Sequence, residues 1–516
     1  MYQKLLNGFI DWFYYYSTNK KQRWLTRIFF GVLLLGGIYL WGTFLNWGNI
    51  SFSFLDWADI TGPRLSFLRD AMTKLVLPLH ISDPAALQAT TDRFLSVPNT
   101  FIGPTVILLH YLTIQQFIIV QTILMFIAGF AGLLVLGEQL KLSPFAFTIL
   151  FFLFNFNGHI LSHYSVGHFS WNSYFLLAWF AVLIIEMLQK KRVGWAWVTE
   201  MTLVMFLIFL QGAFHFFLYS LTFLLVLAIC SAKYFWTVVK TIIASAAISA
   251  IRIAPALLET GAMKVPYLGG YPMAHSLWDA LVTLTYSRTF STSNGVNGRL
   301  GNWEFTIYIG LVGALFLIFF GIYCTLKNGR KTSAGQDGQR TPAAQGSPYR
   351  LLLLPCLVFT FFSFSAVFKE LRNLLNIPPL TGERIASRLF IFAVLFLLVL
   401  AIYELQKWLD SIQISSLFVL SSLLLLGIEI NDLWQNFQFW GVAYSSTQYK
   451  NPSIFDQSHW VVTNHPDLRY RVMLAGGLGV TCLTLIVLVF LVRKDKRLAA
   501  KASLVKNSLE DPSIPI

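Results

Sequence analysis

Two carboxylates stand close together just after the first long apolar run of the sequence, between residues 50 and 82. Only 12% of the 516 residues are charged, yet this stretch holds Asp56, Asp59, Arg64 and His80. Two acids three residues apart point the same way on a helical turn, and a carboxylate within hydrogen-bond reach of a hydroxyl group can take up its proton. Asp56 and Asp59 are therefore candidates for general acid–base chemistry. The alternative is that these charges only solvate a helix lying at an interface.

Three histidines follow in residues 155–171, at positions 159, 163 and 168. His159 and His163 have the i, i+4 spacing that can ligate a metal ion. No acid or cysteine in the stretch completes such a site, so we predict no metal ligands here. Together with its asparagines and Tyr164, the stretch favours hydrogen bonding to a polar ligand. The alternative is a set of satisfied polar residues at the end of a helix.

Further charged residues stand at the ends of later apolar runs. Glu304 comes just before one run, and Arg384 and Arg388 enter another with the i, i+4 spacing that lets two guanidinium groups grip one phosphate. The alternative for these arginines is anchoring to lipid headgroups. Arg252 is the only basic residue well inside an apolar run. A charge within a membrane faces protein or a polar cavity and is a functional candidate by default.

The elements that must position these groups are apolar helices. Hydrophobic residues make up 56% of the chain, and the share of charged residues is about half that of a soluble domain. Apolar runs long enough to cross a hydrocarbon core of about 30 Å recur throughout. We predict an all-α polytopic membrane protein with about twelve spans and, over residues 63–77, an amphipathic helix at the membrane surface. The expected spans are residues 27–47, 116–136, 144–157 (short, and tilted, half-buried or broken), 171–188, 194–210, 213–231, 236–255, 305–326, 351–368, 387–405, 413–431 and 472–493.

The distribution of lysine and arginine sets the expected orientation. The net charge of +14 gathers at one side of the membrane if both termini are cytoplasmic. The basic excess then reflects topology and contact with anionic lipid, and it excludes a nucleic-acid-binding face, which needs a basic patch on one module. This orientation places four longer segments on the outer face of the plasma membrane, at residues 48–115, 256–304, 369–386 and 432–471. Function is expected there.

The chain divides at its polar segments. We expect the following parts: an aromatic interfacial segment at residues 1–24, an N-terminal membrane module at 25–327 with outer loops 48–115 and 256–304, a flexible cytoplasmic linker at 328–349, a C-terminal membrane module at 350–493, and a basic, unstructured cytoplasmic tail at 494–516. The four cysteines lie in apolar runs without CxxC spacing, which argues against disulfides and thiolate metal sites.

Taken together, these features resemble the GT-C superfamily of integral membrane glycosyltransferases. The shared features are an acid just after the first span, helices in a large first outer loop, and arginines on later outer segments. Within the superfamily the chain is most similar to the bacterial YfhO-like and related uncharacterised polytopic branch. The motifs that carry this resemblance are Asp59, PRLSFL at residues 63–68, LPLH at 77–80, the NGH…H…GH pattern of 157–168 and WEFTIYIG at 303–310.

The resemblance implies transfer of a sugar from a polyprenyl-phosphate carrier to a lipid, glycan or protein acceptor on the outer face. It implies Asp59 as the general base, with Asp56 as second candidate or as the group that orients it. Cationic groups would hold the donor phosphate, and a polar set would line the sugar or acceptor site. The expected phosphate ligands are Arg384, Arg388, Arg252 and Arg64, and the expected sugar-site residues are His159, His163, His168, Glu304 and His80.

Two other classes of function stay open at this point. One is a transporter or lipid flippase, which predicts charged or broken helices near the middle of the membrane. The other is a non-catalytic scaffold of an envelope assembly complex, for which Asp56 and Asp59 would be dispensable. The cofactor is also open, because the two acids permit a divalent metal ion without demanding one. No nucleic acid is expected among the partners.

Overall fold

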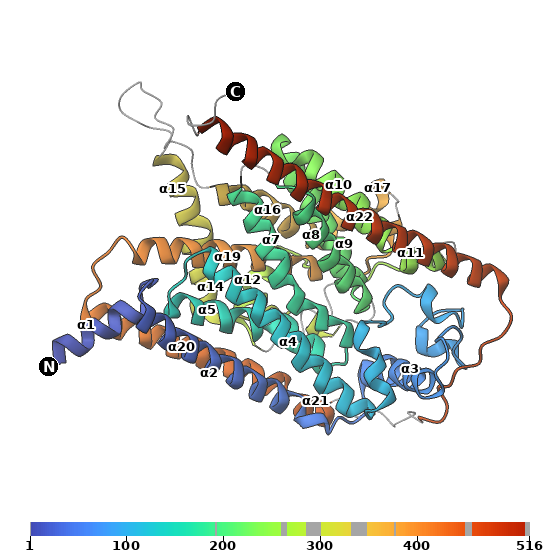
Figure 1. Cartoon of the computed structure of the whole chain (residues 1–516). Coiled ribbons are helices and arrows are strands. Elements are labelled where there is room, and N and C mark those ends of the chain that lie inside the picture. The colour runs from blue at the N-terminus through green and yellow to red at the C-terminus, as the bar shows by residue number, and fades with distance from the viewer. Residues whose placement is uncertain are drawn as a thin grey trace.

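The chain is built from helices. The computed structural model describes residues 2–190, 193–259, 266–284, 301–331, 348–375, 378–448 and 457–510, and these contain isolated β-bridges but no strand. Figure 1 shows the arrangement. The helices are α1 (Tyr2–Phe13), α2 (Lys20–Phe44), α3 (Gly62–Lys74), α4 (Ile114–Gln139), α5 (Pro144–Asn155), α6 (Gly158–Ser165), α7 (Leu177–Gln189), α8 (Trp195–Leu210), α9 (Phe214–Cys230), α10 (Ala232–Ile248), α11 (Ala250–Ala256), α12 (Ala274–Val282), α14 (Gly310–Phe316), α15 (Thr325–Lys331), α16 (Leu353–Phe362), α17 (Ser365–Leu375), α18 (Pro378–Thr381), α19 (Phe390–Leu409), α20 (Ser416–Trp440), α21 (Val442–Gln448) and α22 (Leu468–Glu510).

Apolar helices of membrane-crossing length confirm the polytopic architecture. Among the described residues, eight helical segments are long and apolar enough to cross a membrane. A ninth candidate is the pair α10 and α11, which bends by 66° at Ser249. Three further apolar helices are shorter: α8, α9 and Pro348–Phe362. Each span expected from the sequence overlaps one of these segments, so the apolar runs are helical as predicted.

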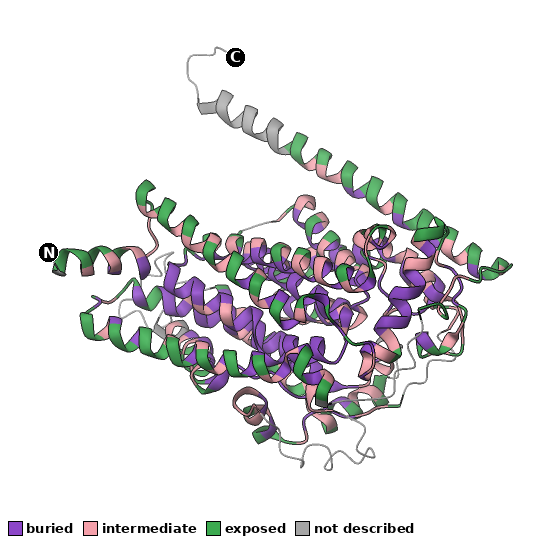
Figure 2. Ribbon diagram, turned by 90° about the horizontal axis from the view of Figure 1, so that it is seen from below, coloured by how far each residue is buried: buried purple, intermediate pink, exposed green. Residues whose placement is uncertain are grey.

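The helices form a central and a peripheral layer. The candidate spans Pro144–Ser165, Phe169–Gln189 and Ala386–Leu409 are each 89% buried in protein, whereas those of α2 and α22 are only 17% buried. Figure 2 shows buried residues in the middle of the bundle and exposed ones along the long helix that leads to the C-terminus. α22 packs on α8, α10 and α11, and α2 packs on α4 and α20. Because the exposed faces of α2 and α22 are apolar, they are suited to contact lipid.

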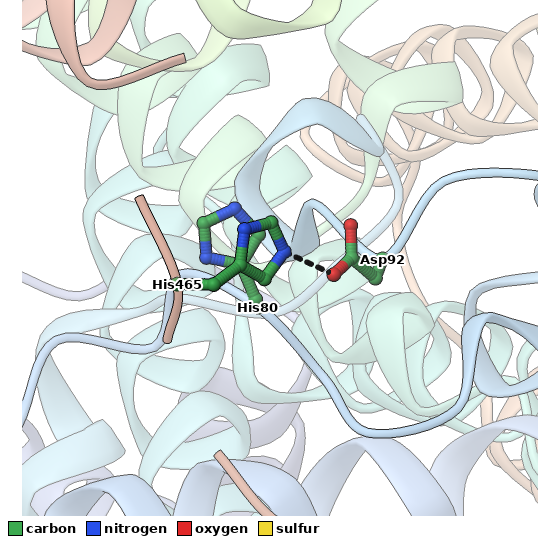
Figure 3. A group of neighbouring side chains, drawn as sticks. All are labelled: His80, Asp92 and His465. Carbon is green, nitrogen blue, oxygen red and sulfur yellow. Dashed lines mark hydrogen bonds and ion pairs between the residues drawn. The ribbon is translucent and has the colours of Figure 1, made fainter. Parts of the chain in front are cut away.

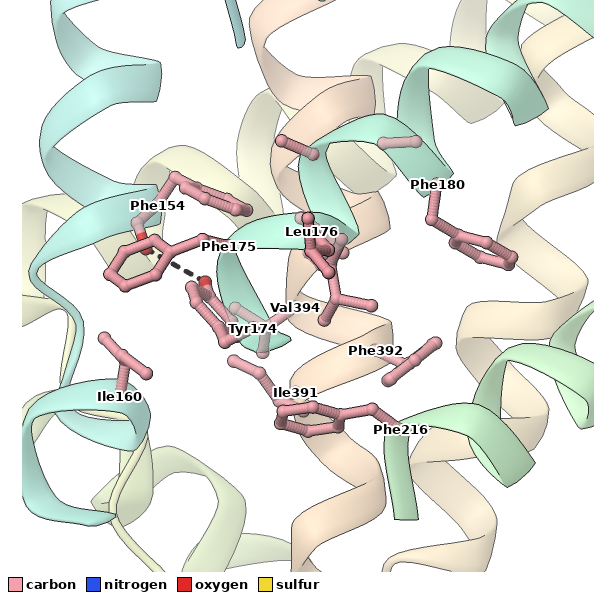
Figure 4. Close-up of a cluster of buried hydrophobic side chains, with 14 of the residues drawn as sticks. Phe154, Ile160, Tyr174, Phe175, Leu176, Phe180, Phe216, Ile391, Phe392 and Val394 are labelled. Atoms are coloured by element: carbon pink, nitrogen blue, oxygen red, sulfur yellow. Dashed lines mark hydrogen bonds between the residues drawn. The ribbon is translucent and has the colours of Figure 1, made fainter. Parts of the chain in front are cut away.

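An aromatic core joins the central helices. Phe154 of α5, Tyr174, Phe216 of α9 and Phe392 of α19 are buried in one cluster (Figure 4). The hydroxyl group of Tyr174 donates a hydrogen bond of 2.9 Å to the carbonyl oxygen of Phe154 and accepts one from Asn157. This core fixes the helix ends that carry the polar residues described below.

The third expected span is broken at its asparagines. The side-chain amide of Asn155 donates to the carbonyl of Phe151, and that of Asn157 donates to Leu153 and Phe154. Asn157 also accepts from the backbone N–H of Ile160 and so caps α6. Asparagine competes for backbone hydrogen bonds in this way, and the competition ends α5 and restarts the chain as α6.

The long loop after α2 folds into a small lobe with the segment before α22. Residues 48–113 contain α3 and several short 3₁₀ helices, and Figure 1 shows them at one end of the bundle. α3 is a helix as predicted, but its first two turns are buried on all sides rather than lying on a surface. Residues 457–470 cover it. The N–H of Thr463 donates to His80 O (3.0 Å), and that of Val462 donates to the Asp70 carboxylate (2.8 Å).

The two ends of the chain are more ordered than the sequence suggests. Tyr14, expected in an interfacial segment, is fully buried, and its hydroxyl contacts that of Ser422 in α20 at 2.7 Å. The basic tail, expected to be unstructured, continues α22 as helix to Glu510, because it is rich in alanine, leucine and lysine, which favour helix. Most of the expected flexible linker, residues 332–347, lies outside the described residues.

Candidate functional site

A chain of acid and base groups joins the long loop after α2 to the histidine segment. Asp56 Oδ2 lies 2.9 Å from Nε2 of His168, and the Nδ1 atoms of His168 and His163 lie 2.6 Å apart. A carboxylate only accepts hydrogen bonds. The network therefore assigns Nε2–H of His168 to Asp56, and leaves Nδ1 of His168 to accept from Nδ1–H of His163. Asp56 is half-buried, with 31% of its side chain exposed, and His163 is fully buried.

Glu304 and Arg388 form an ion pair beside the inner end of this chain. Arg388 donates from Nε and Nη2 to the two carboxylate oxygens of Glu304, at 2.7 and 2.6 Å. Glu304 Oε2 is 4.0 Å from the remaining ring nitrogen of His163, and the Arg388 guanidinium lies 5.0 Å over the ring of Trp171. Trp171 donates its indole N–H to Nε2 of His159 at 3.1 Å. Two-point contact fixes the carboxylate and guanidinium in one plane, so this end of the chain is rigid.

Backbone contacts hold Asp56 against the histidine turn. The N–H of Asp56 donates to Val166 O at 3.0 Å, and the indole of Trp57 donates to Ser165 O at 2.9 Å. The Thr61 hydroxyl donates to Gly167 O at 2.6 Å. Gly167 has φ of +100°, and a Cβ atom there would stand 2.3 Å from the backbone nitrogen of Trp57. Glycine is therefore required where the two segments meet.

Two charged groups beside this chain have no partner among the described residues. Asp59 is exposed, and its pKa is raised by partial burial and by the negative charge of Asp56. The Nε of Arg384 is buried without a hydrogen bond. The pKa of Arg384 is lowered below its usual range by burial and by the neighbouring Arg388. The acids Glu304, Glu383 and Asp56 offset part of this lowering. Arg384 thus faces the same charged groups as the chain and is free to bind an anion.

A second buried acid stands next to Arg384 in the sequence. Glu383 Oε2 accepts from the Tyr219 hydroxyl at 2.5 Å and lies 2.7 Å from Nδ1 of His215. Burial raises the pKa of Glu383, but His215, Arg388 and Tyr219 together outweigh it and lower the pKa to about 2. Glu383 is therefore ionised, and it anchors the segment that carries Arg384 to α9.

Arg64 and Arg252 are occupied by backbone carbonyls. Arg64 donates to Ala86 O, Leu87 O and Asn99 O at 2.9–3.2 Å. Nη2 of Arg252 lies 3.0 Å from the carbonyl oxygens of Val97, Pro98 and Thr100. These contacts tie the long loop after α2 together and to α11, which is a structural role. Nε and Nη1 of Arg252 are buried without a partner among the described residues.

His80 belongs to a different group of side chains. Its ring stacks on that of His465 with centroids 3.9 Å apart, and Asp92 and Asp467 lie beside the two rings. The sequence predicted no metal ligands. In the described part of the chain, two groups of three have metal-ligating atoms close enough to share an ion: His163, His168 and Glu304, and His80, Asp92 and His465.

The arrangement supplies a half-exposed carboxylate, two histidines that hold it in place and an unpaired cation. His168 donates to Asp56 and accepts from His163, because imidazole accepts at one nitrogen while it donates from the other. Arg384 can neutralise negative charge on a bound group. A carboxylate, histidines and a free arginine in this arrangement can serve glycosyl transfer, acyl transfer or the proton-coupled movement of an anion.

The structure brings together Asp56, His159, His163, His168, Glu304 and Arg388, with Arg384 beside them, from segments far apart in the sequence. Asp59 stands next to this set, whereas Arg64, Arg252 and His80 have the other partners just described. Sequence reasoning missed Trp171, His215, Tyr219 and Glu383. A signal existed for three of them, because Glu383 directly precedes Arg384 and Tyr219 follows His215 at i+4.

Fold and site define this chain as an all-α polytopic membrane protein with a charged cluster at one end of its apolar helices. No family model matches the chain, and no curated protein or solved structure matches it either.

Proposed function

We propose that this protein is a membrane glycosyltransferase of the GT-C type. It would transfer a sugar from a polyprenyl-phosphate-linked donor to an acceptor hydroxyl group on the outer face of the plasma membrane. The observation that carries the proposal is the hydrogen-bonded chain from Asp56 through His168 to His163, with the Glu304–Arg388 ion pair and unpaired Arg384 beside it.

The reaction needs three things from the protein. The acceptor oxygen forms a bond to the anomeric carbon of the sugar, and the bond from that carbon to the carrier phosphate oxygen breaks. A base must take the acceptor proton, a cation must stabilise the leaving phosphate, and an apolar surface must hold the carrier lipid. Asp56 is accessible for the first task, Arg384 for the second, and the exposed apolar faces of the peripheral helices for the third.

In this proposal Asp56 takes the acceptor proton. The resemblance implied Asp59 as base and Asp56 as second candidate. Asp56 is favoured here because three hydrogen bonds from its segment fix that segment to the histidine turn and because His168 donates to its carboxylate and orients it. Asp59 stands beside it with a free carboxylate and is suited to contact the acceptor. Arg388 is engaged by Glu304 and would act by holding that acid in place.

The finer topology also belongs to this proposal. The chain would cross the membrane twelve times, counting the shorter apolar helices and the bent pair α10 and α11, with both termini in the cytoplasm. Asp56, His168, Glu304 and Arg384 would then lie at the outer ends of the spans, where a lipid-linked sugar is presented.

A transporter or flippase is the second candidate, and two features favour it. Glu429 of α20 is 4% exposed, and neither carboxylate oxygen has a hydrogen-bond partner among the described residues. The 66° bend between α10 and α11 also makes a broken span. Buried acids and broken helices are typical of transport pathways. Uptake into sealed vesicles without any sugar transfer would support this alternative.

Mass spectrometry of cells with and without the gene tests the proposal. Loss of the gene is expected to deplete one envelope glycan or glycolipid and to raise the level of one polyprenyl-linked sugar. A gene copy encoding Asp56→Asn is expected to leave both changes in place, whereas the wild-type copy reverses them. Unchanged envelope glycans and unchanged lipid-linked sugars in the deletion strain would contradict glycosyl transfer.

A further inference from the structure

His80, Asp92 and His465 form a compact group where the first and the last outer segments meet. One candidate ligand atom from each residue lies within 4.8 Å of the others. His465 Nε2 is 2.8 Å from Asp92 Oδ2, and the His80 and His465 rings stack. Figure 3 shows the two imidazole rings against each other, with the carboxylate of Asp92 beside them. His80 and Asp92 come from the first outer loop and His465 from the segment that covers it.

The ring of His80 is buried and unpaired. The residue is 0% exposed, and neither ring nitrogen has a hydrogen-bond partner among the described residues. Buried polar groups in folded proteins nearly always have a partner. The nearest acid is Asp467, whose Oδ2 is 3.7 Å from His80 Nε2, but that oxygen is engaged by Arg93 Nε at 2.7 Å. A ligand with affinity for imidazole nitrogen would satisfy His80.

The ligand set selects a borderline transition metal. Two imidazoles and one carboxylate match zinc, whereas Mg²⁺ and Ca²⁺ prefer sites made of oxygen. In a tetrahedral zinc site with bonds of about 2.0–2.1 Å, two ligand atoms stand about 3.3 Å apart. The distance between His465 Nε2 and Asp92 Oδ2 is 2.8 Å. It would have to grow by only about half an ångström for the ion to replace the proton that the two atoms share.

The surroundings complete such a site. An open pocket of about 530 Å³ is lined by Asp92, His465 and Asp467, among others. It offers an entry path and room for water as a fourth ligand. The carboxylate of Asp467 lies 3.7 Å from Nε2 of His80 and is placed to orient that ring. Carboxylates next to metal-bound histidines commonly hold the imidazole in this way.

We propose that His80, Asp92 and His465 bind one divalent transition-metal ion, with zinc as the best match, and that the ion clamps the last outer segment onto the first. The clamp is independent of the sugar-transfer proposal. It joins residues that backbone hydrogen bonds already bring together, such as Thr463 N–H to His80 O at 3.0 Å. Because the unfolded chain cannot hold the three ligands together, bound metal favours the closed lobe.

Zinc binding to the full chain, purified in detergent and freed of metal by chelation, tests the clamp. Calorimetric titration with zinc is expected to show one site per chain. His465→Gln and Asp92→Asn are the main variants, because both side chains reach solvent and their loss should leave the fold intact. Each is expected to weaken zinc binding by at least about 100-fold. Mutating a residue that only hydrogen-bonds to a metal ligand already costs about 10–100-fold, and loss of the ligand itself should cost more.

The matched control is His275→Gln. His275 is another exposed histidine, 4.0 Å from Asp279, but no second histidine joins it. Its loss is expected to leave zinc affinity unchanged. Zinc should also slow proteolytic cleavage within residues 457–467 in the wild type and have no such effect in His465→Gln. The proposal is overturned if micromolar zinc does not bind the wild type, if His465→Gln binds it as tightly as the wild type, or if zinc leaves the cleavage rate unchanged.

Discussion

Asp56 Oδ2 lies 2.9 Å from Nε2 of His168, a contact that joins the loop after α2 to the turn between α6 and the next span. The side chain of His168 is only 10% exposed, and its other ring nitrogen forms a hydrogen bond with His163. The carboxylate is therefore the accessible end of a buried chain of acid and base groups.

Replacing His168 by glutamine should slow the chemical step more than it weakens binding. Glutamine can still donate a hydrogen bond to Asp56, but it lacks the rigid ring that Asp56 and His163 hold between them, so the carboxylate is less well positioned. A displacement of about 1 Å can cost about 100-fold in rate, so we expect kcat of His168→Gln to fall by about that factor with a small change in KM. Steady-state kinetics of sugar transfer would measure both. A KM effect alone would indicate that His168 only binds substrate.

Gly167→Ala should reduce activity without removing any functional group. A Cβ atom at Gly167 would stand 2.3 Å from the Trp57 nitrogen and push the Asp56 segment away from His168. A displacement of about 1 Å can cost about 100-fold in rate, and we expect a loss of that order in transfer activity.

The control is Gly48→Ala, which also has positive φ but whose added Cβ would meet its nearest atom at 3.3 Å. It separates backbone strain from the close approach to Asp56 and should retain most activity. Equal losses in the two variants would contradict this role of Gly167.

Arg384 and Arg388 should differ although they are only four residues apart. Arg384 is unpaired, so Arg384→Ala is expected to raise KM for the lipid-linked donor by about 10–100-fold, the effect of losing a charged hydrogen bond, with little change in thermal stability. Arg388→Ala leaves Glu304 buried without its partner. Breaking a buried ion pair costs about 3–5 kcal/mol. Thermal unfolding in detergent and donor titrations distinguish the two effects, and similar profiles for both variants would argue against this division.

Glu383 should make stability depend on pH in the acid range. Its pKa is about 2 against an ordinary value of 4.5. A depressed pKa stabilises the fold above the unfolded value, and this contribution is lost as pH falls from about 4.5 to about 2. The shift corresponds to about 3 kcal/mol. Glu383→Gln should lower the unfolding temperature at pH 7 and flatten its dependence on pH below 4.5. Glu370→Gln, an exposed acid of α17, should change neither. A wild-type-like pH dependence in Glu383→Gln would contradict the assignment.

The helices follow from the sequence because apolar runs carry their own signal. Every expected span coincides with an apolar helix, and the doubtful third span is broken where Asn155 and Asn157 compete for backbone carbonyls. The sequence also selected most members of the polar cluster, because each stands at the end of an apolar run. The sequence did not predict that the helix continues beyond residue 494. The charges there suggest a solvated tail, whereas the helix propensity of the same residues favours a helix.

The pairing of side chains could not be predicted, because it depends on which helix ends meet. Arg388 was expected to hold phosphate, but Glu304, far away in the sequence, occupies two of its nitrogens. Arg64 and Arg252 looked like free cations, but loop carbonyls surround them. The resemblance assigned His80 to the sugar or acceptor site together with the other histidines, whereas the segment before α22 brings His465 to it. Contacts of this kind become visible only in three dimensions.

The central claim is that Asp56 serves as the base in sugar transfer, and purified protein tests it most directly. The measurement is the rate of transfer from labelled polyprenyl-linked sugars to acceptors in a membrane extract, for wild type, Asp56→Asn and Asp59→Asn, each confirmed as folded by its thermal unfolding. We predict transfer by the wild type, a loss of about 10²–10⁴-fold in Asp56→Asn and a smaller loss in Asp59→Asn. Full activity in folded Asp56→Asn would contradict the account.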